Sequence, residues 1–207
     1  MKTLIAIPCM DSCPTDFLRS LLGLEIVGTA QFTFAQGSLI YDSRNKLCSL
    51  ALENDFDRVL WLDSDMIFSG DLMRRFSAHL DAGREMICGA YASRKPPIQP
   101  VIYEDFGIRD AKPWPEPYTT PYKRPFPAEP FQVAGCGFGA VMMTTGLIRR
   151  IREQFGLPFS PAAGFGEDLS FCLRAREAGA EIWCDPAIKL GHVGAMAFFL
   201  EEQEVPL

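Results

Sequence analysis

The sequence lacks any apolar run near the ~20 residues that a membrane-spanning helix needs. Its first residues, MKTLIAIPCMD, also lack the small-residue cleavage site of a signal peptide. No Cys-x-x-Cys pair occurs, and the seven cysteines are spaced like neither a zinc site nor a disulfide framework. We therefore expect a cytoplasmic protein with no transmembrane segment and with reduced, mostly buried thiols.

Positive charge is also scarce. The formal net charge is −6, with 20 Lys and Arg against 26 Asp and Glu, and the basic residues are scattered. We therefore expect no nucleic-acid partner bound through its phosphate backbone. The sequence also has no G-x-S-x-G, P-loop or H-E-x-x-H motif, which disfavours serine-nucleophile hydrolases, P-loop NTPases and zincins.

What is present is an alternation of strand and helix patterns. The length of 207 residues and the 48% hydrophobic content suit one domain with a sizeable core. Strands are expected at 3–8, 30–36, 58–62, 85–91, 131–145 and 181–186, and helices at 14–24, 39–55, 70–83, 146–155 and 166–179. Thr15 is the expected N-cap of the first helix, and Gly83 is expected to close the third. This succession predicts an α/β fold with a mainly parallel central sheet, which binds ligands at the carboxyl ends of its strands.

Proline interrupts the alternation between residues 96 and 130, where ten of the sixteen prolines occur. Because proline prevents regular helix, we expect a long irregular excursion, with at most a short strand at 100–103. Its many aromatic residues favour an ordered flap over the site. The acidic tail from about residue 201 is expected to be disordered.

Two aspartates, Asp63 and Asp65, directly follow the buried strand at 58–62, with Ser64 between them. Side chains alternate along a strand, so both carboxylates would point the same way and repel unless a cation lies between them. Mg²⁺ and Mn²⁺ prefer oxygen ligands. A helix cap followed by a solvated turn would explain the same residues.

Glu167 and Asp168 stand in the first turn of a predicted helix, where negative charge suits the helix dipole. They follow the flexible segment SPAAGFG, and a carboxylate held there could accept a proton from a hydroxyl group. His192, in LGHVG, is either a structural residue with satisfied hydrogen bonds or a ligand of a Mn²⁺ ion.

Arg44 and Asn45 lie early in the helix that precedes the DSD strand, and Arg44 could pair with the DSD carboxylates, bind a phosphate or lie on a solvated face. The glycines of GCGFG at 135–139 have the wrong spacing and position for a dinucleotide-binding fingerprint. They favour close approach of the backbone to a ligand.

The order of these motifs resembles the GT-A glycosyltransferases close to family 2. The matching segments are LIAIP, SRNKL, VLWLDSD, AGCGFGAVMMTT, GEDLSFCLRAREAG and GHVG, and they cover residues 3–95 and 131–194. The resemblance implies a single αβα-sandwich domain over residues 1–207 that transfers a sugar from a nucleotide-sugar donor to an acceptor hydroxyl. The segment IPCMD departs from the family pattern, and the absence of a Q-x-x-R-W motif argues against a polymer synthase.

The resemblance also implies a role for each motif. Asp65 and His192, aided by Asp63, would bind a divalent metal, Mn²⁺ or Mg²⁺, on the donor diphosphate. Asp168, with Glu167 beside it, would be the base of an inverting displacement, although retaining enzymes share the fold. The donor, a UDP-sugar by frequency in the family, would contact Pro8, Arg44, Asn45, Asp63, Ser64, Gly137, Phe138 and Gly139, and the acceptor would contact Trp114 and Tyr118.

Three other functions remain open from the sequence. A haloacid-dehalogenase-like phosphohydrolase also uses D-x-D after a strand, but near the N-terminus. A sugar-nucleotide nucleotidyltransferase would need a glycine-rich phosphate loop, which IPCMDSCPT lacks. A non-catalytic nucleotide-sugar-binding module would lose no turnover when Asp168 is replaced.

Overall fold

A seven-stranded sheet forms the centre of the computed structural model, which describes residues 1–194 except 38 and 95, together with residues 197–198. The strands across the sheet are β2 (Thr29–Gln36), β1 (Lys2–Cys9), β3 (Arg58–Leu62), β10 (Ala140–Thr144), β5 (Met86–Ala90), β11 (Ile182–Lys189) and β8 (Phe131–Val133). The helices are α1 (Thr15–Leu22), α2 (Ile40–Glu53), α3 (Leu72–Asp81), α4 (Thr145–Phe155) and α5 (Glu167–Glu177). The expected mixed α/β architecture is therefore present.

Five of the seven strands run in one direction, as the pairings show. β1 is parallel to β2 and β3, and β11 is parallel to β5, whereas β10 and β8 are antiparallel to their neighbours. The expectation of a mainly parallel sheet is confirmed, although the sheet is mixed. The antiparallel β10 starts where β3 ends, and the carbonyl of Gly139 there accepts a hydrogen bond of 3.0 Å from the backbone N–H of Asp63.

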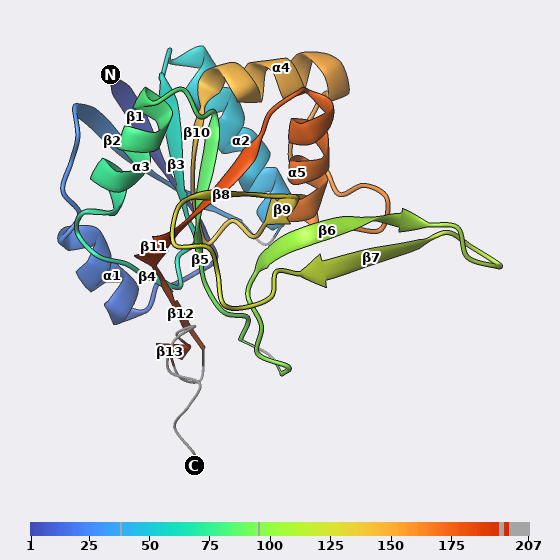
Figure 1. Ribbon diagram of the computed structural model, residues 1–207. Helices are drawn as coiled ribbons and strands as arrows, with labels where there is room; N and C mark the ends of the chain where they lie inside the picture. The colour runs from blue at the N-terminus through green and yellow to red at the C-terminus, as the bar shows by residue number, and fades with distance from the viewer. Residues whose placement is uncertain (38, 95, 195–196, 199–207) are drawn as a thin grey trace, which may run out of the picture.

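The helices cover both faces of the sheet, as Figure 1 shows. One buried cluster packs under α2, α4 and α5 and includes Val59, Trp61 and Phe138, while the other packs under α1 and α3 and includes Leu60 and Phe76. Neighbouring residues of β3 thus belong to opposite clusters. This explains the continuous apolar run, because a central strand is buried on both faces.

Two of the differences from the expected elements concern the first helix and the strand at 131–145. The N-cap of α1 is Pro14, and Thr15 is the first helical residue, so Thr15 does not cap the helix. The single strand expected over 131–145 is divided into β8, β9 (Gly135–Cys136) and β10. The glycines that interrupt it let the chain leave the main sheet and pair β9 with the hairpin described next.

The proline-rich excursion is regular rather than irregular, which corrects the expectation for residues 102–121. It forms an antiparallel hairpin of β6 (Ile102–Arg109) and β7 (Glu116–Pro121), with β9 on the other side of β6. Proline cannot donate to a strand ladder, but β7 is the edge of this small sheet, so Pro117 and Pro121 are tolerated. The hairpin projects from the body of the molecule in Figure 1.

A second small sheet brings the C-terminal part of the chain to the DSD segment. It consists of β4 (Met66–Ile67), β12 (Gly191–Val193) and β13 (Ala197–Phe198). His192 pairs with Met66, and the backbone N–H of Val193 donates to the carbonyl of Asp65 at 2.8 Å. The tail from residue 201, expected to be disordered, lies outside the described residues.

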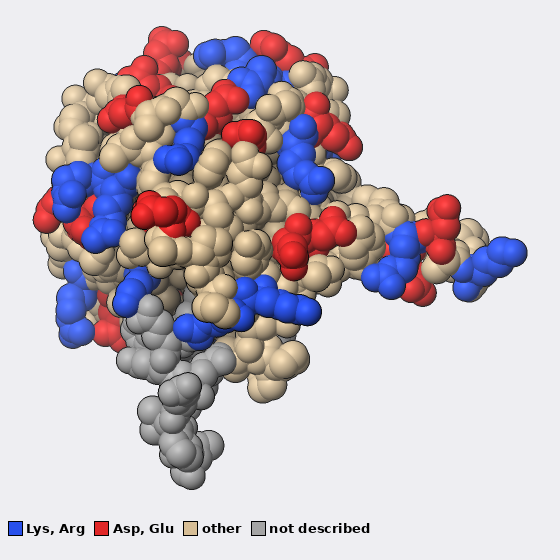
Figure 2. All heavy atoms as spheres, viewed as in Figure 1, with Lys and Arg blue, Asp and Glu red and all other residues tan. Residues whose placement is uncertain are grey.

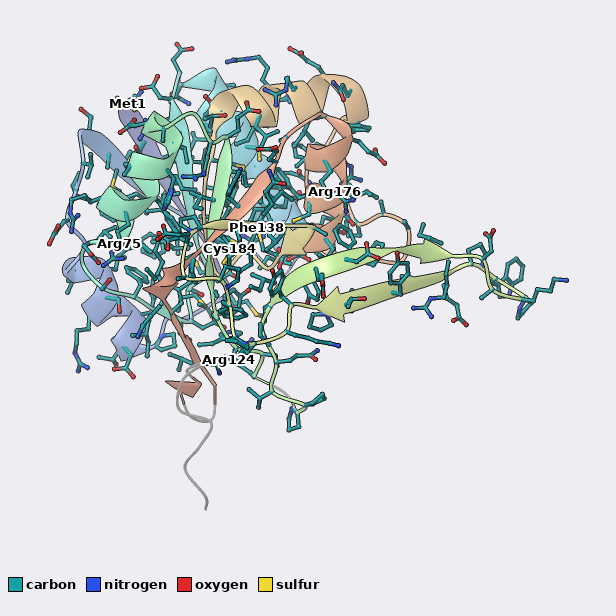
Figure 3. All side chains as sticks on the ribbon, in the orientation of Figure 1. Met1, Arg75, Arg124, Phe138, Arg176 and Cys184 are labelled. Atoms are coloured by element: carbon teal, nitrogen blue, oxygen red, sulfur yellow. The ribbon has the colours of Figure 1, made fainter. Side chains whose placement is uncertain are left out.

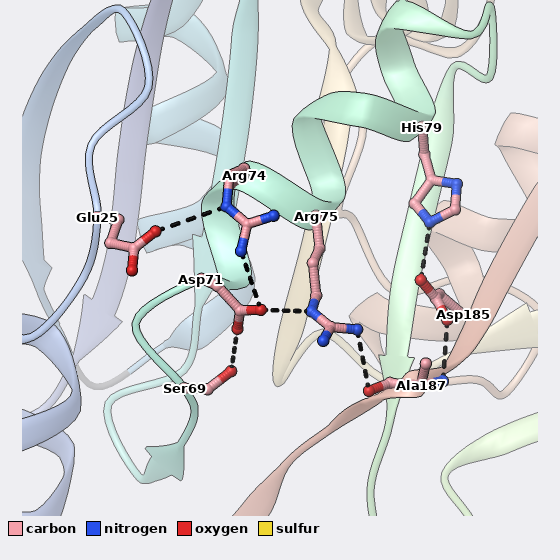
Figure 4. A network of polar contacts seen from close by, with 8 residues as sticks. All are labelled: Glu25, Ser69, Asp71, Arg74, Arg75, His79, Asp185 and Ala187. Carbon is pink, nitrogen blue, oxygen red and sulfur yellow. Dashed lines mark hydrogen bonds and ion pairs between the residues drawn. The ribbon is translucent and has the colours of Figure 1, made fainter.

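Polar contacts fix α3 against β11 (Figure 4). Asp71 accepts hydrogen bonds from Arg75 Nε at 2.6 Å and Ser69 Oγ at 2.5 Å, and Nε2 of His79 lies 2.8 Å from an oxygen of Asp185. One of the two histidines thus has a structural partner. Among the described residues, no helix has the length and apolar composition of a membrane span.

Candidate active site

A pocket of about 730 Å³ lies at the carboxyl ends of β1 and β3, where the fold predicts a ligand. Its volume is in the range of small-molecule sites. The lining residues come from the end of β1, from loops after strands, and from α2, α5 and β12: Pro8, Cys9, Met10, Ser12, Pro14, Gly37, Ile40, Asp63, Ser64, Asp65, Tyr91, Arg94, Asp168 and His192. The structure therefore brings Pro8, the DSD segment, Asp168 and His192 together around one cavity.

The DSD segment is a turn and not an extension of the strand. β3 ends at Leu62, Ser64 and Asp65 are turn residues, and the backbone N–H of Met66 donates to the carbonyl of Asp63 at 3.2 Å. The expected alternation of strand side chains therefore does not apply. Asp63 pairs with Arg44 at 2.8 Å, whereas Asp65 pairs with Arg94 at 2.8 Å, so the two carboxylates have separate basic partners.

His192 lies beside Asp65, with Nε2 at 3.6 Å from Oδ2. Its Nδ1 lies 2.9 Å from the carbonyl of Ala92, to which Nδ1–H donates, and Nε2 faces Asp65. Such a backbone partner is the usual support of a metal-binding imidazole. Although burial alone would raise it, the contacts with His192 and Arg94 lower the pKa of Asp65, which keeps the carboxylate ionised.

The described residues contain no group of three or more His, Cys, Asp or Glu side chains arranged to hold a metal ion. Asp65 and His192 supply one oxygen and one nitrogen, a donor set that suits Mn²⁺, and Asp63 is turned towards Arg44. Two protein ligands fit an ion that takes its remaining ligands from water and substrate phosphates, as catalytic Mg²⁺ commonly does.

Arg44 lies beneath the pocket, with no exposed surface, and faces three carboxylates. Nη2 is 2.8 Å from Asp63 and 3.4 Å from Asp168, and Nε is 3.8 Å from Glu167. The guanidinium carbon lies 5.1 to 5.8 Å from the ring centres of Trp61, Phe138 and Phe159. These rings confine the guanidinium group, so a fixed buried cation links the DSD turn to the start of α5.

One cation opposite three carboxylates leaves the cluster with excess negative charge. Burial raises the pKa of Asp168 to about 7, with Glu167 and Asp63 adding to the rise and Arg44 opposing it. Burial also raises the pKa of Asp63 against the effect of Arg44. The carboxyl of Asp168 faces the pocket and accepts the backbone N–H of Phe138 at 3.2 Å, so it is held in place with a proton affinity suited to general-base chemistry.

Several predicted donor contacts do not line the pocket. Oδ1 of Asn45 accepts the backbone N–H of Phe159 at 2.9 Å and so anchors the chain after α4. The ring of Phe138 is fully buried in the interior (Figure 3). A Cβ atom at Gly137 would overlap Oη of Tyr91, and one at Gly139 would lie 2.9 Å from the ring of Tyr91. The absence of a side chain at these two glycines therefore lets Tyr91, and not a ligand, pack against the backbone.

The two predicted acceptor contacts lie on the hairpin, and neither lines the pocket. Trp114 is 77% exposed in the connection between β6 and β7. Tyr118 donates from Oη to Asp105 at 2.8 Å, and the guanidinium of Arg109 lies 4.8 Å from its ring centre. An acceptor role for these residues stays a prediction, and it requires an acceptor large enough to contact both the pocket and the hairpin.

Two residues of the pocket, Tyr91 and Arg94, are not among those that the sequence predicts. Tyr91 accepts the backbone N–H of Gly139 at 3.3 Å, and its ring packs edge-on against that of His192 at 5.2 Å. Arg94 forms the ion pair with Asp65. The sequence does carry a signal for both: Tyr91 ends the predicted strand 85–91 and Arg94 lies three residues beyond it, at the carboxyl end where such sheets bind ligands.

The mixed α/β architecture is similar to that of proteins of known structure. No family model matches the chain, and no curated protein sequence matches it. Among solved structures, A197 from STIV matches with a TM-score of 0.65 and 19% identity, over 100% of this chain and 98% of that one. GalNAc-T7 with UDP, GalNAc and Mn²⁺ matches with a TM-score of 0.59 and 10% identity, over 100% of this chain and 45% of that one. At these identities the likeness shows the fold alone, and this chain spans less than half of GalNAc-T7.

Proposed function

We propose that this protein is a divalent-metal-dependent glycosyltransferase that moves a sugar from a nucleoside-diphosphate sugar, of which a UDP-sugar is the first candidate, to an acceptor hydroxyl. The observation that carries the proposal is the convergence of Asp65, His192 and Asp168 on one pocket at the carboxyl ends of the strands. The fold it shares with GalNAc-T7, a structure that holds UDP and Mn²⁺, supports the proposal.

Each pocket residue has a defined task in this reaction. Asp65 and His192 would hold the divalent cation, which when bound would neutralise charge on the leaving diphosphate. Pro8 and the following residues Cys9 and Met10 would border the nucleoside. Asp168 would take the proton of the acceptor hydroxyl as that oxygen attacks the sugar, which is the inverting course. Arg44 holds Asp168 in place from below and does not touch the substrate.

The face of the molecule in Figure 2 lacks the basic patch typical of a protein that binds nucleic acid. On the face in Figure 2, acidic and basic side chains alternate, and no continuous basic stripe is visible. A haloacid-dehalogenase-like mechanism is also disfavoured, because it would use Asp63 as the nucleophile and this carboxylate is engaged by Arg44.

Ligand-dependent thermal stability tests the proposal. The full chain is heated with UDP, GDP and their sugar conjugates, each with Mn²⁺ or with a chelator. A true ligand at ~100 times its dissociation constant should add about 2.7 kcal/mol to the free energy of unfolding. Asp65→Ala should abolish the metal-dependent part of the shift and the release of sugar from the donor. The control Asp71→Ala, which alters a carboxylate outside the pocket, should retain both. The proposal fails if no nucleotide stabilises the protein in the presence of metal.

A further inference from the structure

A cation of the chain itself, Arg94, occupies the place next to the proposed metal ligands. Nη1 of Arg94 lies 2.8 Å from Oδ2 of Asp65, and the same nitrogen donates to the carbonyl of Val193 at 3.2 Å. Oδ2 of Asp65 is also the oxygen that lies 3.6 Å from Nε2 of His192. One carboxylate oxygen is therefore shared by the guanidinium group and by the imidazole.

This ion pair and a metal ion exclude each other. A divalent cation bound between Asp65 and His192 would approach the same oxygen that Arg94 contacts, and it would lie within a few ångströms of a second positive charge. Like charges at such separations repel by an energy on the order of several kcal/mol when water is partly excluded. Arg94 must therefore leave Asp65 when the ion binds.

The side chain of Arg94 is only partly buried, and a diphosphate bound in the pocket would give it a second partner. Its side chain is 45% exposed and lines the same cavity as Asp65 and Ser64. The planar guanidinium group can donate two parallel hydrogen bonds to phosphate oxygens. A diphosphate bound in this cavity would therefore accept hydrogen bonds from Arg94. Each negative group keeps a positive partner after this exchange. The divalent cation replaces Arg94 at Asp65, and Arg94 pairs with the negatively charged diphosphate.

We propose that Arg94 is an exchange residue: it neutralises Asp65 while the site holds no metal, and it transfers to the diphosphate of the nucleotide when the metal binds. The inference rests on the proposed function for the identity of the second partner. It assigns to Arg94 a task in donor binding and makes metal binding and diphosphate binding mutually dependent, because each ligand favours the same position of the side chain.

The first test measures Mn²⁺ alone, by following the electron paramagnetic resonance signal of the free ion during titration of the full chain. Arg94→Gln should bind Mn²⁺ about three- to tenfold more tightly than the wild type, because the competing charge is gone. Arg94→Lys should stay near the wild type. Arg19→Gln, which removes the same charge from an exposed ion pair with Asp16, controls for net charge and should not tighten binding. Unchanged or weaker Mn²⁺ binding by Arg94→Gln overturns the proposal.

The second test measures UDP and uridine by calorimetry in saturating Mn²⁺. Arg94→Gln should weaken UDP binding about tenfold or more and leave uridine binding unchanged, since only UDP carries phosphate oxygens that can accept charged hydrogen bonds from Arg94. An equal loss for both ligands, or none for UDP, overturns the exchange. If the wild type binds no nucleotide at all, the proposed function fails and the exchange onto phosphate fails with it. The Mn²⁺ titration still decides separately whether Arg94 competes with the ion.

Discussion

Asp168 illustrates how a single residue acquires its chemistry from its neighbours. In the sequence it is one of two acids at the start of a helix, where the helix dipole favours the ionised form. In the fold, burial raises its pKa to about 7, with Glu167 and Asp63 adding to the rise and Arg44 opposing it. The raised pKa makes Asp168 a stronger base than an exposed aspartate, which has a pKa of about 4.

This raised pKa has a measurable effect on stability. The folded protein holds the proton of Asp168 up to a pH of about 7, and the unfolded chain releases it near pH 4. The free energy of unfolding should therefore fall as the pH rises from about 5 to about 7. In Asp168→Asn this part of the decrease should disappear, as measured by urea denaturation in the presence of a chelator.

Asp71→Asn provides the control for that measurement. Hydrogen bonds from Arg75 and Ser69 lower the pKa of Asp71, so its titration lies below this pH window. Its pH profile between 5 and 7 should run parallel to that of the wild type. Identical slopes for Asp168→Asn and the wild type would contradict the assignment of a raised pKa to Asp168.

At the scale of elements, no residue of the β6–β7 hairpin lines the pocket. The hairpin projects from the body in Figure 1 and carries Trp114, 77% exposed, in its connecting turn. An exposed aromatic face suits a sugar ring, and a projecting arm suits an acceptor that extends beyond the pocket. The hairpin therefore remains the predicted acceptor arm, although the site itself lies elsewhere.

Trp114→Ala tests this role. Because the side chain is exposed, the replacement should change the free energy of unfolding by no more than about 0.5 kcal/mol. It should leave Mn²⁺-dependent UDP binding and sugar release to water unchanged, and it should lower transfer to a glycan or glycosylated acceptor about fivefold, since aromatic stacking with a ring contributes on the order of 1 kcal/mol. Phe155→Ala, a partly exposed aromatic on α4, serves as the control. Equal transfer by both variants and the wild type would remove the hairpin from acceptor binding.

At the scale of the whole molecule, the proposed metal site depends on segments that are far apart in the chain. Asp65 follows β3, and His192 lies on β12, which pairs with β4 directly after the DSD turn. Neither segment holds a metal alone, since the two side chains approach only across this small sheet. The affinity for the proposed ion should therefore depend on the tertiary fold as well as on the two ligands.

A double-mutant cycle measures this dependence. Asp65→Ala and His192→Ala should each lower Mn²⁺ affinity at least about tenfold, and the double variant should lose little more, because both ligands serve one ion. Paramagnetic resonance of free Mn²⁺ gives the three affinities. His79→Ala should leave Mn²⁺ affinity unchanged, because His79 contacts Asp185 in the network of Figure 4. Additive losses in the double variant would show two independent effects and not a shared ion.

Much of the architecture follows from local patterns. The alternation that predicted strands at 3–8 and 58–62 and a helix at 39–55 is reproduced in β1, β3 and α2, because core strands and amphipathic helices bury characteristic sets of residues. The position of Asp63 and Asp65 beside a pocket followed from the same pattern. Local sequence patterns do not predict which strands pair with one another. They gave no sign that β10 lies between β3 and β5.

The sequence by itself determined the α/β class and placed Asp63, Asp65 and Asp168 as the candidate chemistry, because periodicity and charge placement are local properties. Only the tertiary structure decided which groups meet: it turned Asp63 to Arg44, and it set His192 and Arg94 against Asp65. These contacts join segments remote in sequence, and their energies depend on distance and burial. Neither quantity exists until the sheet has formed.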